Sequence, residues 1–256
     1  MPTSKTKQLV PGANSSRKLL NALLCFTEAR PFWSVPELAD VLDLSITSTY
    51  RYVALLREVG LLEGAPEGAY RVAELVLSLT AACQASRPPL ADIARPFLAR
   101  IRDEIDETVL IATRSGDAAY CVERVESRRQ VRLQFDRGQA MTLHRGSMAR
   151  ILLAAMSKKE LQRYFANLVD TPEPALAAQL TEGVLKATLE QGWTESFEEI
   201  DEGIWGAAAA ITHNGMTIAS IGLAAPIYRV DKERRDNIIM LVRDAGTQIS
   251  ALLDSY

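Results

Sequence analysis

The chain has 256 residues, with 29 basic and 32 acidic side chains and a formal net charge of −3. This length suits one large domain or two ordinary ones, and 48% hydrophobic with 24% charged residues is typical of a globular protein. The charge balance excludes a polycation that holds nucleic acid by bulk charge. It does not exclude a local basic patch.

Targeting signals and cysteines indicate the compartment. No apolar run approaches the ~18–20 residues that a membrane span needs, and the N-terminus lacks the apolar core of a signal peptide. The three cysteines, Cys25, Cys83 and Cys121, are scattered and odd in number, which argues against a disulfide framework. We therefore expect a cytoplasmic protein with no membrane partner.

The charges are unevenly distributed along the chain. Residues 1–33 carry five basic side chains and one acidic side chain, whereas residues 73–256 carry 21 basic and 25 acidic ones. A basic front followed by an acidic remainder predicts two domains with different partners, and a solvated N-terminal tail is the alternative.

The composition of the first residues predicts a disordered N-terminal tail followed by a helix. Residues 1–14 are rich in Lys, Thr, Ser, Pro and Gly, a composition typical of disorder. Leucines at helical spacing follow from Ser15 onward, with Ser16 as the candidate N-cap and Pro31 as the stop.

A helix-turn-helix pattern comes next. Ser34–Glu37 forms a capping box that starts a second helix, and Ser45 can cap a third helix that Gly60 ends. Leu61–Val72 contains two short strands around a Gly/Pro turn. Three short helices followed by a hairpin predict a winged helix-turn-helix over residues 15–72.

The third predicted helix has a core stripe and a polar start. The stripe consists of Thr49, Tyr52, Val53, Leu56 and Val59. Off this stripe, near the amino end, stand Ile46, Thr47, Tyr50 and Arg51. Short hydroxyl side chains and an arginine at a helix start suit base edges and phosphates. A plain three-helix bundle with a solvated third helix is the alternative.

The rest of the chain predicts a linker and a mixed domain. Residues 73–85 and 90–105 read as two helices, which together form a linker over 73–105. Strands are expected at 107–114, 119–125, 131–133, 206–212 and 217–224, and helices at 147–156, 158–168, 175–191 and 232–253. Antiparallel hairpins interrupted by helices predict an α+β domain with one central sheet over 106–256.

A search for catalytic and metal motifs is negative. The sequence has no Gly-rich phosphate loop, no nucleophile elbow and no Cys or His metal motif. The carboxylate run Glu195, Glu198, Glu199, Asp201 and Glu202 is read as a solvated loop, with an acid/base pair or metal ligands as the alternative. We therefore expect no catalytic residues, no metal and no cofactor.

The segment Leu143–Arg150 is more informative. It leads into a helix whose first residues are small, and backbone N–H groups at a helix start suit a bound carboxylate. Arg145 would add positive charge there. A close-packed turn that needs Gly146 for its geometry is an equally good interpretation.

These segments together resemble the IclR family of bacterial transcriptional regulators over nearly the whole chain. The matching pieces, in order, are Ser34–Leu44 with Ser48–Arg51, Leu61–Val72, Leu90–Leu98, Glu107–Leu110, Val122–Glu126, Leu143–His144 with Ala149–Ala154, Gly192–Trp193, Asp201–Gly203 and Ala207–Ala209. No single piece is specific, but the ordered set is.

The resemblance implies an N-terminal winged helix-turn-helix and a C-terminal GAF-like effector domain, so the fold class is mixed α/β with two domains. It also implies dimers, often paired into tetramers, and a pocket for a small organic acid. Ala149-Arg150 replaces the family's frequent Gly-Lys, and Arg145 and Met148 stand where small residues are common. Gly222 and Ala224 stand where the family can have Ser. A pocket poor in hydroxyls, with Met148 and Trp205 nearby, favours an apolar or aromatic acid, and a small keto acid is the alternative.

We therefore expect a ligand-responsive regulator that binds a double-stranded DNA operator. The residues expected to contact DNA are Arg17, Lys18, Thr47, Ser48, Tyr50, Arg51 and Arg71. Those expected to bind the effector are Cys121, His144, Arg145, Gly146, Ser147, Met148, Trp205, Ala210, Gly222 and Ala224. Two alternatives are an enzyme acting on a small acid through His144 and Cys121, and a module whose helical front binds protein.

Overall fold

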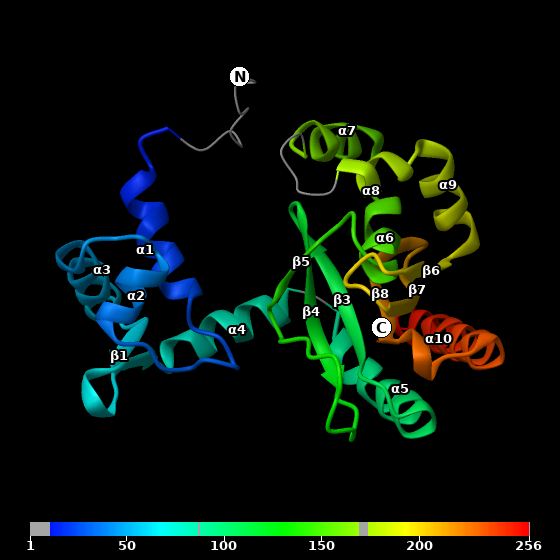
Figure 1. Cartoon of the computed structure of the whole chain (residues 1–256), viewed down its shortest axis with the longest axis horizontal. Coiled ribbons are helices and arrows are strands. Elements are labelled where there is room, and N and C mark those ends of the chain that lie inside the picture. Colours follow the sequence, from blue (N-terminus) through cyan, green and yellow to red (C-terminus); the bar gives the residue numbers. More distant parts are fainter. Residues whose placement is uncertain (1–10, 87, 169–173, 256) are drawn as a thin grey trace. The chain divides into compact units, whose positions relative to one another are not determined.

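The structure is a computed structural model that describes residues 11–86, 88–168 and 174–255. The described chain forms two compact units, residues 11–86 and residues 88–255 (Figure 1). Of the predicted tail, residues 1–10 lie outside the described residues. The two helices expected to form the linker are divided, one in each unit.

The first unit contains four helices and a small hairpin. Its elements are α1(Asn14–Leu24), α2(Val35–Val41), α3(Ile46–Glu58), β1(Leu62–Gly64), a 3₁₀ turn at Pro66–Gly68, β2(Tyr70–Val72) and α4(Leu75–Ala85). The strands pair antiparallel, and Trp33 extends this sheet by exchanging backbone hydrogen bonds with Tyr70 at 2.8 and 3.2 Å. This arrangement is the predicted winged helix-turn-helix.

Local signals explain these helices. The predicted capping box is present, because Ser34 accepts a hydrogen bond from the N–H of Glu37 and the Glu37 side chain accepts one from the N–H of Ser34. The core of the unit is made by Ala22, Trp33, Val35, Leu38, Val53, Leu56 and Leu62. The prediction for Ser16 is wrong, since α1 begins earlier and its N-cap is Ala13.

The stripe predicted on the third helix is shorter than expected. Thr49, Val53 and Leu56 are buried, whereas Tyr52 is half-buried. Val59 is 49% exposed, because it is the C-cap of α3 and has left the helical face that packs on the core.

The second unit alternates strands and helices. Its elements are α5(Leu90–Ile105), β3(Val109–Ser115), β4(Ala118–Val125), β5(Ala140–Thr142), α6(Ser147–Ala154), α7(Lys158–Ala166), α8(Pro174–Gln179), α9(Glu182–Gln191), β6(Trp193–Phe197), β7(Ile204–His213), β8(Met216–Pro226), a 3₁₀ turn at Ile227–Arg229 and α10(Lys232–Leu253). The strands form one antiparallel sheet in the order β5-β4-β3-β8-β7-β6.

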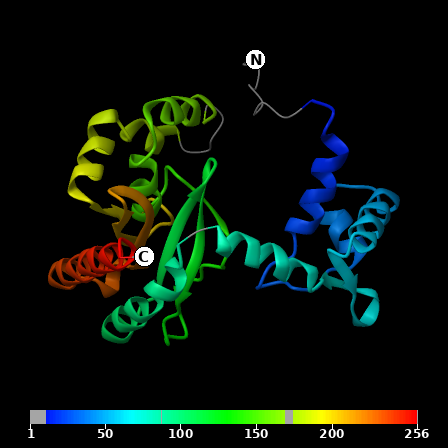
Figure 2. The same cartoon turned by 180° about the vertical axis from the view of Figure 1, so that it is seen from behind.

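Helices cover both faces of this sheet (Figures 1 and 2). Side chains from α5 and α10 pack against one face, together with Val109, Ile111 and Trp205. Side chains from α6, α7 and α9 pack against the other face, together with Leu110 and Ala208. The result is an α+β domain with one central sheet, as predicted.

One predicted strand is absent. Residues 131–133 form no strand, and the backbone oxygen of Val131 instead accepts hydrogen bonds from Arg229 at 3.1 Å. Ala140–Thr142 supplies the edge strand β5 in its place. A run of three residues carries too little periodicity to distinguish a strand from an extended loop.

Residues 174–197 differ from the prediction in two ways. The helix expected over 175–191 is divided into α8 and α9, because Thr181 caps a new helix by accepting from the N–H of Val184 at 3.3 Å. Trp193–Phe197, where the sequence predicts no strand, is the edge strand β6.

Candidate nucleic-acid interface and effector pocket

The first turns of α3 form an exposed polar surface. Ser45 caps the helix by accepting a hydrogen bond from the N–H of Ser48 at 3.2 Å. Thr47, Tyr50 and Arg51 are exposed. Within the part of the chain that the structure describes, Arg51 has no ion-pair partner. This guanidinium is therefore available for an external anion.

A surface hollow lies beside this helix, between α1 and α3. Its volume is about 370 Å³, and it is lined by Ser15, Ser16, Leu19, Ser48, Arg51, Tyr52 and Leu55. Some of its hydroxyls already have partners: Ser48 accepts from Ser45, which lies outside the lining, at 2.8 Å, and the hydroxyls of Ser15 and Tyr52 are 3.3 Å apart. Hydroxyls next to a guanidinium suit the oxygens of a phosphate backbone.

The other residues expected to contact DNA lie on α1 and on the hairpin. Arg17 and Lys18 are half-buried in α1. Arg71 is exposed on β2, where its Nε lies 2.6 Å from a carboxylate oxygen of Glu63 on β1. A phosphate contact by Arg71 would therefore have to replace an ion pair that already exists.

The second unit has a cavity at the amino end of α6. Its volume is about 30 Å³, and it is lined by Leu110, Phe135, Met141, Arg145, Gly146, Ser147, Met148, Ala149, Ile200, Gly206, Leu223 and Ala224. Five of the residues expected to bind the effector, Arg145 to Met148 and Ala224, are among them. The space holds about one water molecule, whereas ligand pockets usually measure about 300–1,000 Å³.

Glu199 occupies the start of α6. Its carboxylate accepts a hydrogen bond from the N–H of Gly146 at 3.0 Å and forms an ion pair with Arg150. The side chains of Glu199 and Arg150 are only 12% and 14% exposed. The prediction of a solvated carboxylate loop is therefore wrong for this residue, because tertiary contacts bring it against a helix start.

The segment around Glu199 is also held through its backbone. Arg145 donates hydrogen bonds to the backbone oxygen of Glu199 at 2.7 Å and to that of Ile200. The Ile200 side chain lies directly over Gly146, where an added Cβ would come within 2.9 Å of its Cδ1. Gly146 has φ +82°, which favours glycine and agrees with the interpretation as a close-packed turn, and the carboxylate at its N–H is that of Glu199.

Trp205 does not line this cavity, which corrects the prediction. It is completely buried in the core on the opposite face of the sheet, against α5 and α10. Its indole N–H donates to the carboxylate of Glu195 at 2.8 Å. Successive strand residues point to opposite faces, so Gly206 and not Trp205 faces the cavity.

Cys121 and His144 lie on the α6 side of the sheet but do not line the cavity. Cys121 is buried, its thiol donates to the backbone oxygen of Glu123 at 3.7 Å, and burial raises its thiol pKa to about 11. The Nδ1 of His144 lies 2.8 Å from the hydroxyl of Tyr164. Both are placed as core residues.

Gly222 and Ala210 are likewise behind the cavity. A Cβ added at Gly222 would lie 2.9 Å from Cγ of Met148, so this glycine allows Met148 to pack directly on β8. Ala210 is half-buried and packs against the core on the α6 side. Gly222 thus supports a lining residue, and Ala210 belongs to the core without forming the lining.

The sequence reasoning missed several residues of this site. Phe135, Met141 and Ile200 line the cavity, Glu199 binds the helix start, and the hydroxyl of Ser196 accepts from the N–H of Ser147 at 3.1 Å. The carboxylate run was the one available signal, and it gave no indication of which carboxylate is buried.

Comparisons with known proteins fit both units. A family model described as the IclR helix-turn-helix domain matches residues 16–66, and one described as the bacterial transcriptional regulator IclR C-terminal domain matches residues 83–251. The chain belongs to the IclR family. It is thus a DNA-binding transcriptional regulator.

Relatives of this IclR-family protein match it over most of its length. The HTH-type transcriptional regulator KipR of Bacillus subtilis is 28% identical over 245 residues, which are 92% of this chain and 94% of KipR. The HTH-type transcriptional repressor AllR of Escherichia coli K12 is 27% identical over 225 residues, 86% of this chain and 83% of AllR.

A solved structure shows the same fold. It is an IclR homologue from Microbacterium hydrocarbonoxydans complexed with 4-hydroxybenzoate, with a TM-score of 0.77 and 18% identity, covering 95% of this chain and 100% of that one. At this identity the likeness shows the fold alone.

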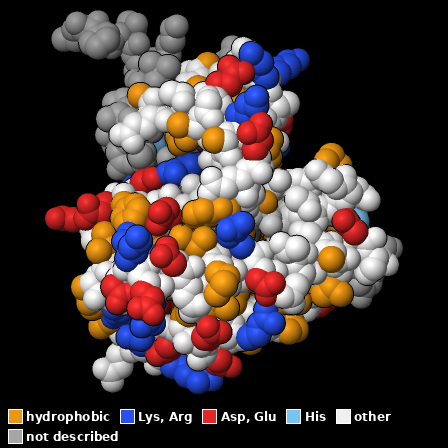
Figure 3. All heavy atoms as spheres, turned by 90° about the vertical axis from the view of Figure 1, so that its right-hand side faces the viewer, with side chains coloured by type: hydrophobic (Ala, Val, Ile, Leu, Met, Phe, Trp, Pro, Cys, Tyr) orange, Lys and Arg blue, Asp and Glu red, His pale blue; other side chains and the backbone are white. Residues whose placement is uncertain are grey.

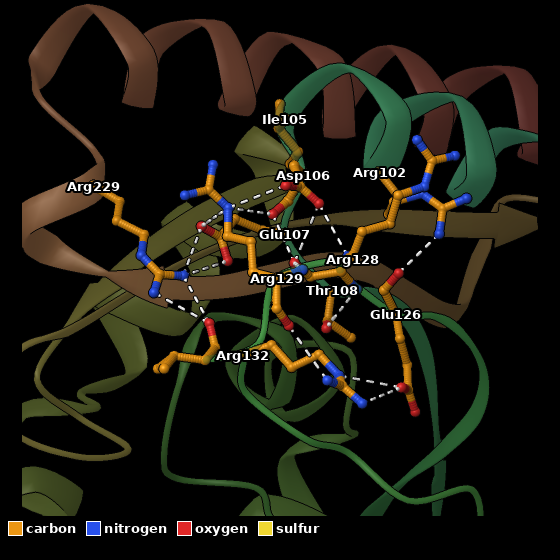
Figure 4. Close-up of polar contacts among 12 residues, drawn as sticks. Arg102, Ile105, Asp106, Glu107, Thr108, Glu126, Arg128, Arg129, Arg132 and Arg229 are labelled. Carbon is orange, nitrogen blue, oxygen red and sulfur yellow. Dashed lines mark hydrogen bonds and ion pairs between the residues drawn. The ribbon is translucent and has the colours of Figure 1, made fainter.

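An arginine-rich segment of this IclR-family chain is structural. In residues 126–132, which follow β4, Arg129 bonds the backbone oxygen of Asp106 at 3.0 Å and Arg132 pairs with Glu126 at 3.1 Å (Figure 4). Arg229 reaches Glu107, which is 1% exposed, at 3.3 Å. Arg129 and Arg229 connect the segment to residues 106 and 107, just before β3, whereas Arg132 holds the segment to itself.

Basic and acidic side chains are also mixed on the surface. On the face drawn in Figure 3, described Lys and Arg side chains alternate with Asp and Glu, and hydrophobic side chains lie between them. Such a surface does not favour the DNA backbone over any other partner. No helix among the described residues is long and apolar enough to cross a membrane.

Proposed function

We propose that this regulator binds its operator as a homodimer through α3, and that a small organic acid bound at the start of α6 changes its affinity for DNA. The observation that carries the proposal is Arg51, an exposed arginine with no ion-pair partner among the described residues, on a capped helix beside a hydroxyl-lined hollow.

The division of labour follows the two units. Residues 15–72 would bind the operator, with Thr47, Ser48, Tyr50 and Arg51 in the major groove and Arg17, Lys18 and Arg71 on phosphates. Residues 73–105 would act as the linker and residues 106–256 as the effector domain. A regulator of this kind works where the chromosome is, so we place it in the cytoplasm.

Self-association is supported by α4. Among the described residues of its own unit, this helix buries none of its side chains, and Leu75, Leu77 and Leu79 are each about half exposed or more. A group of large exposed apolar side chains often marks a protein–protein interface. A second copy would also present a second α3, and dimers read two half-sites about 34–36 Å apart.

An acid effector is supported by the chemistry of the pocket. Arg145 and the N–H groups at the start of α6 favour a carboxylate, and the remaining lining is mostly apolar. The Microbacterium neighbour was crystallised with 4-hydroxybenzoate. Coupling of about 1–3 kcal/mol between the acid and DNA would change operator affinity about 5- to 150-fold.

An enzymatic function is not favoured by the candidate groups. The Cys121 thiol pKa of about 11 leaves it protonated near neutral pH, and its hydrogen bond goes to a backbone oxygen, not to a base. We propose that the chain binds its acid without converting it.

Footprinting tests the proposal. The full-length protein is titrated on the DNA that flanks its own gene, at about 50 and about 200 mM salt, with DNA of equal length from elsewhere as the control. We expect two protected half-sites and an affinity that falls steeply with salt, because counterions are released from phosphates. Absence of protection, or equal affinity at both salt concentrations, would contradict it.

A further inference from the structure

The loop 198–203, which joins β6 to β7, closes the cavity at the start of α6. We propose that this loop is an internal occupant of the effector pocket. Glu199 provides the carboxylate and Ile200 the apolar group that an effector acid would otherwise provide, so an acid must displace the loop to bind. This inference rests on the proposed function, because it concerns the regulation of the same pocket.

The polar half of the argument is the position of the Glu199 carboxylate. It accepts a hydrogen bond from the Gly146 N–H at 3.0 Å and forms an ion pair with Arg150. A helix start and an adjacent guanidinium are what an incoming carboxylate would use. With both partners engaged by Glu199, an external acid has to exchange with this side chain.

The apolar half of the argument is the position of Ile200. Its side chain lines the cavity and lies over Gly146, although the residue itself is 40% exposed. The remaining space of about 30 Å³ does not admit an organic acid. Removing Ile200 from the mouth of the cavity is therefore the most direct way to make room.

The two ends of the loop are anchored away from α6: the N–H of Glu198 donates to the backbone oxygen of Ile204 at 2.7 Å, and that of Ile227 to the oxygen of Gly203 at 2.8 Å. Glu198 and Gly203 at its two ends have φ of +53° and +70°, and the Glu198 side chain accepts the N–H of Gly203 at 2.9 Å. The contacts that hold the loop to α6 are hydrogen bonds and ion pairs from Arg145, Gly146 and Arg150. Exchanging them leaves the pairing of β6 with β7 intact.

The competing interpretation is that the pair of Glu199 with Arg150 serves only to stabilise the fold. The two interpretations predict different affinities for small acids after Glu199 is replaced. If the pair of Glu199 with Arg150 only stabilises the fold, its removal lowers stability and creates no affinity for acids. If the loop occupies the pocket, removal of the Glu199 carboxylate leaves a vacant carboxylate site that a small acid can fill.

The test uses the full-length protein with sodium butanoate as the probe. Binding is measured by calorimetry for wild type, Glu199→Ala and Glu202→Ala, at an ionic strength held constant with sodium chloride. Glu202→Ala is the matched control, because it removes the same charge from an exposed position of the same loop. Butyramide, the neutral analogue, tests whether the carboxylate is required.

We expect Glu199→Ala to bind butanoate at least about ten-fold more tightly than wild type and Glu202→Ala, and to show no such gain for butyramide. Equal butanoate affinity in all three proteins would overturn the inference. So would an equal gain for butyramide, because the vacated site would then not select a carboxylate.

A second variant keeps the test decisive if Glu199→Ala does not fold. Glu199→Gln keeps the volume and the hydrogen bond to Gly146 but removes the charge, so it should bind butanoate more tightly than wild type. If Glu199→Gln shows no gain in butanoate affinity, the loop is not an occupant of the effector pocket, whereas the DNA footprint would be unaffected. A missing footprint alongside the gain would instead refute the proposed function.

Discussion

Arg51 and Arg150 both lie in the first two turns of a helix, one in each unit, yet their surroundings are opposite. Arg51 on α3 is exposed, and the described residues provide it with no carboxylate. Arg150 on α6 is nearly buried and is paired with Glu199. The arginine proposed to contact DNA is thus exposed in the isolated chain. The charged groups of the proposed effector pocket are instead already paired with a side chain of the same chain.

The difference extends to the arginines around each site. Near the sheet, Arg129, Arg132 and Arg229 are all paired with carboxylates. These three arginines of the second unit are thus held in internal ion pairs. A small unit with few basic residues can bind DNA if one of them, here Arg51, is exposed and correctly placed on the recognition helix.

The largest expected effect comes from breaking the closed site. In Arg150→Met, Glu199 stays near the start of α6 without its cation. Losing one partner of a mostly buried pair should lower the free energy of unfolding by about 3 kcal/mol, the low end of the range for such pairs. Urea denaturation followed by circular dichroism measures this change.

Arg128→Met is the matched control for that prediction. Arg128 is 69% exposed and pairs with Asp103 at 2.8 Å, so its loss should cost no more than about 1 kcal/mol. Equal destabilisation by the two substitutions would show that the pair of Arg150 with Glu199 is worth no more than a surface contact.

Thiol reactivity provides the next comparison between the two units. Burial raises the Cys121 thiol pKa to about 11, whereas Cys83 on α4 is exposed. Only the thiolate reacts, so alkylation of native protein near pH 7.5 should be about 100-fold or more slower at Cys121 than at an ordinary exposed thiol of pKa about 8.5. Mass spectrometry of iodoacetamide-treated peptides measures both rates.

Unfolded protein serves as the reference for this experiment. In urea, Cys121 should react at the same rate as Cys83, because both burial and the raised pKa are lost. Rapid alkylation of Cys121 in the native protein would favour the alternative in which this thiol performs chemistry.

A smaller effect is expected on the hairpin, where an arginine proposed for DNA is paired. Glu63→Gln releases Arg71 from its ion pair and removes a negative charge from the wing. Because exposed ion pairs contribute about 0–1 kcal/mol, operator affinity should rise by at most about five-fold. Fluorescence anisotropy with labelled operator measures it, and a loss of affinity would show that Arg71 needs Glu63 for its position.

The sequence predicts the architecture well where the signals are local. The capping box at Ser34 and the short turn before Ser45 determine the helix-turn-helix, and the Asn-Gly turn at 214–215 determines the pairing of β7 with β8. Strand β6 was missed because Trp193–Phe197 is polar in part and lies at the sheet edge, where one neighbour is enough to form it.

The sites are less predictable because they depend on packing between distant segments. Periodicity does not show which face of β7 meets α6, so Trp205 was assigned to the wrong side of the sheet. Likewise, Glu199 is one of several carboxylates in its segment, and its burial arises from contacts with Gly146 and Arg150, about 50 residues earlier in the chain.

The role of Arg51 is tested most directly by comparing Arg51→Ala with Arg163→Ala on the footprinted DNA. Arg163 is 59% exposed on α7, so its replacement removes the same charge from the second unit. An arginine that contacts base edges or phosphates contributes about 1–3 kcal/mol. We predict that Arg51→Ala loses at least about ten-fold in operator affinity and has a shallower salt dependence, while Arg163→Ala binds like wild type. Equal affinities for the two variants would contradict the assignment of α3 as the DNA-binding helix.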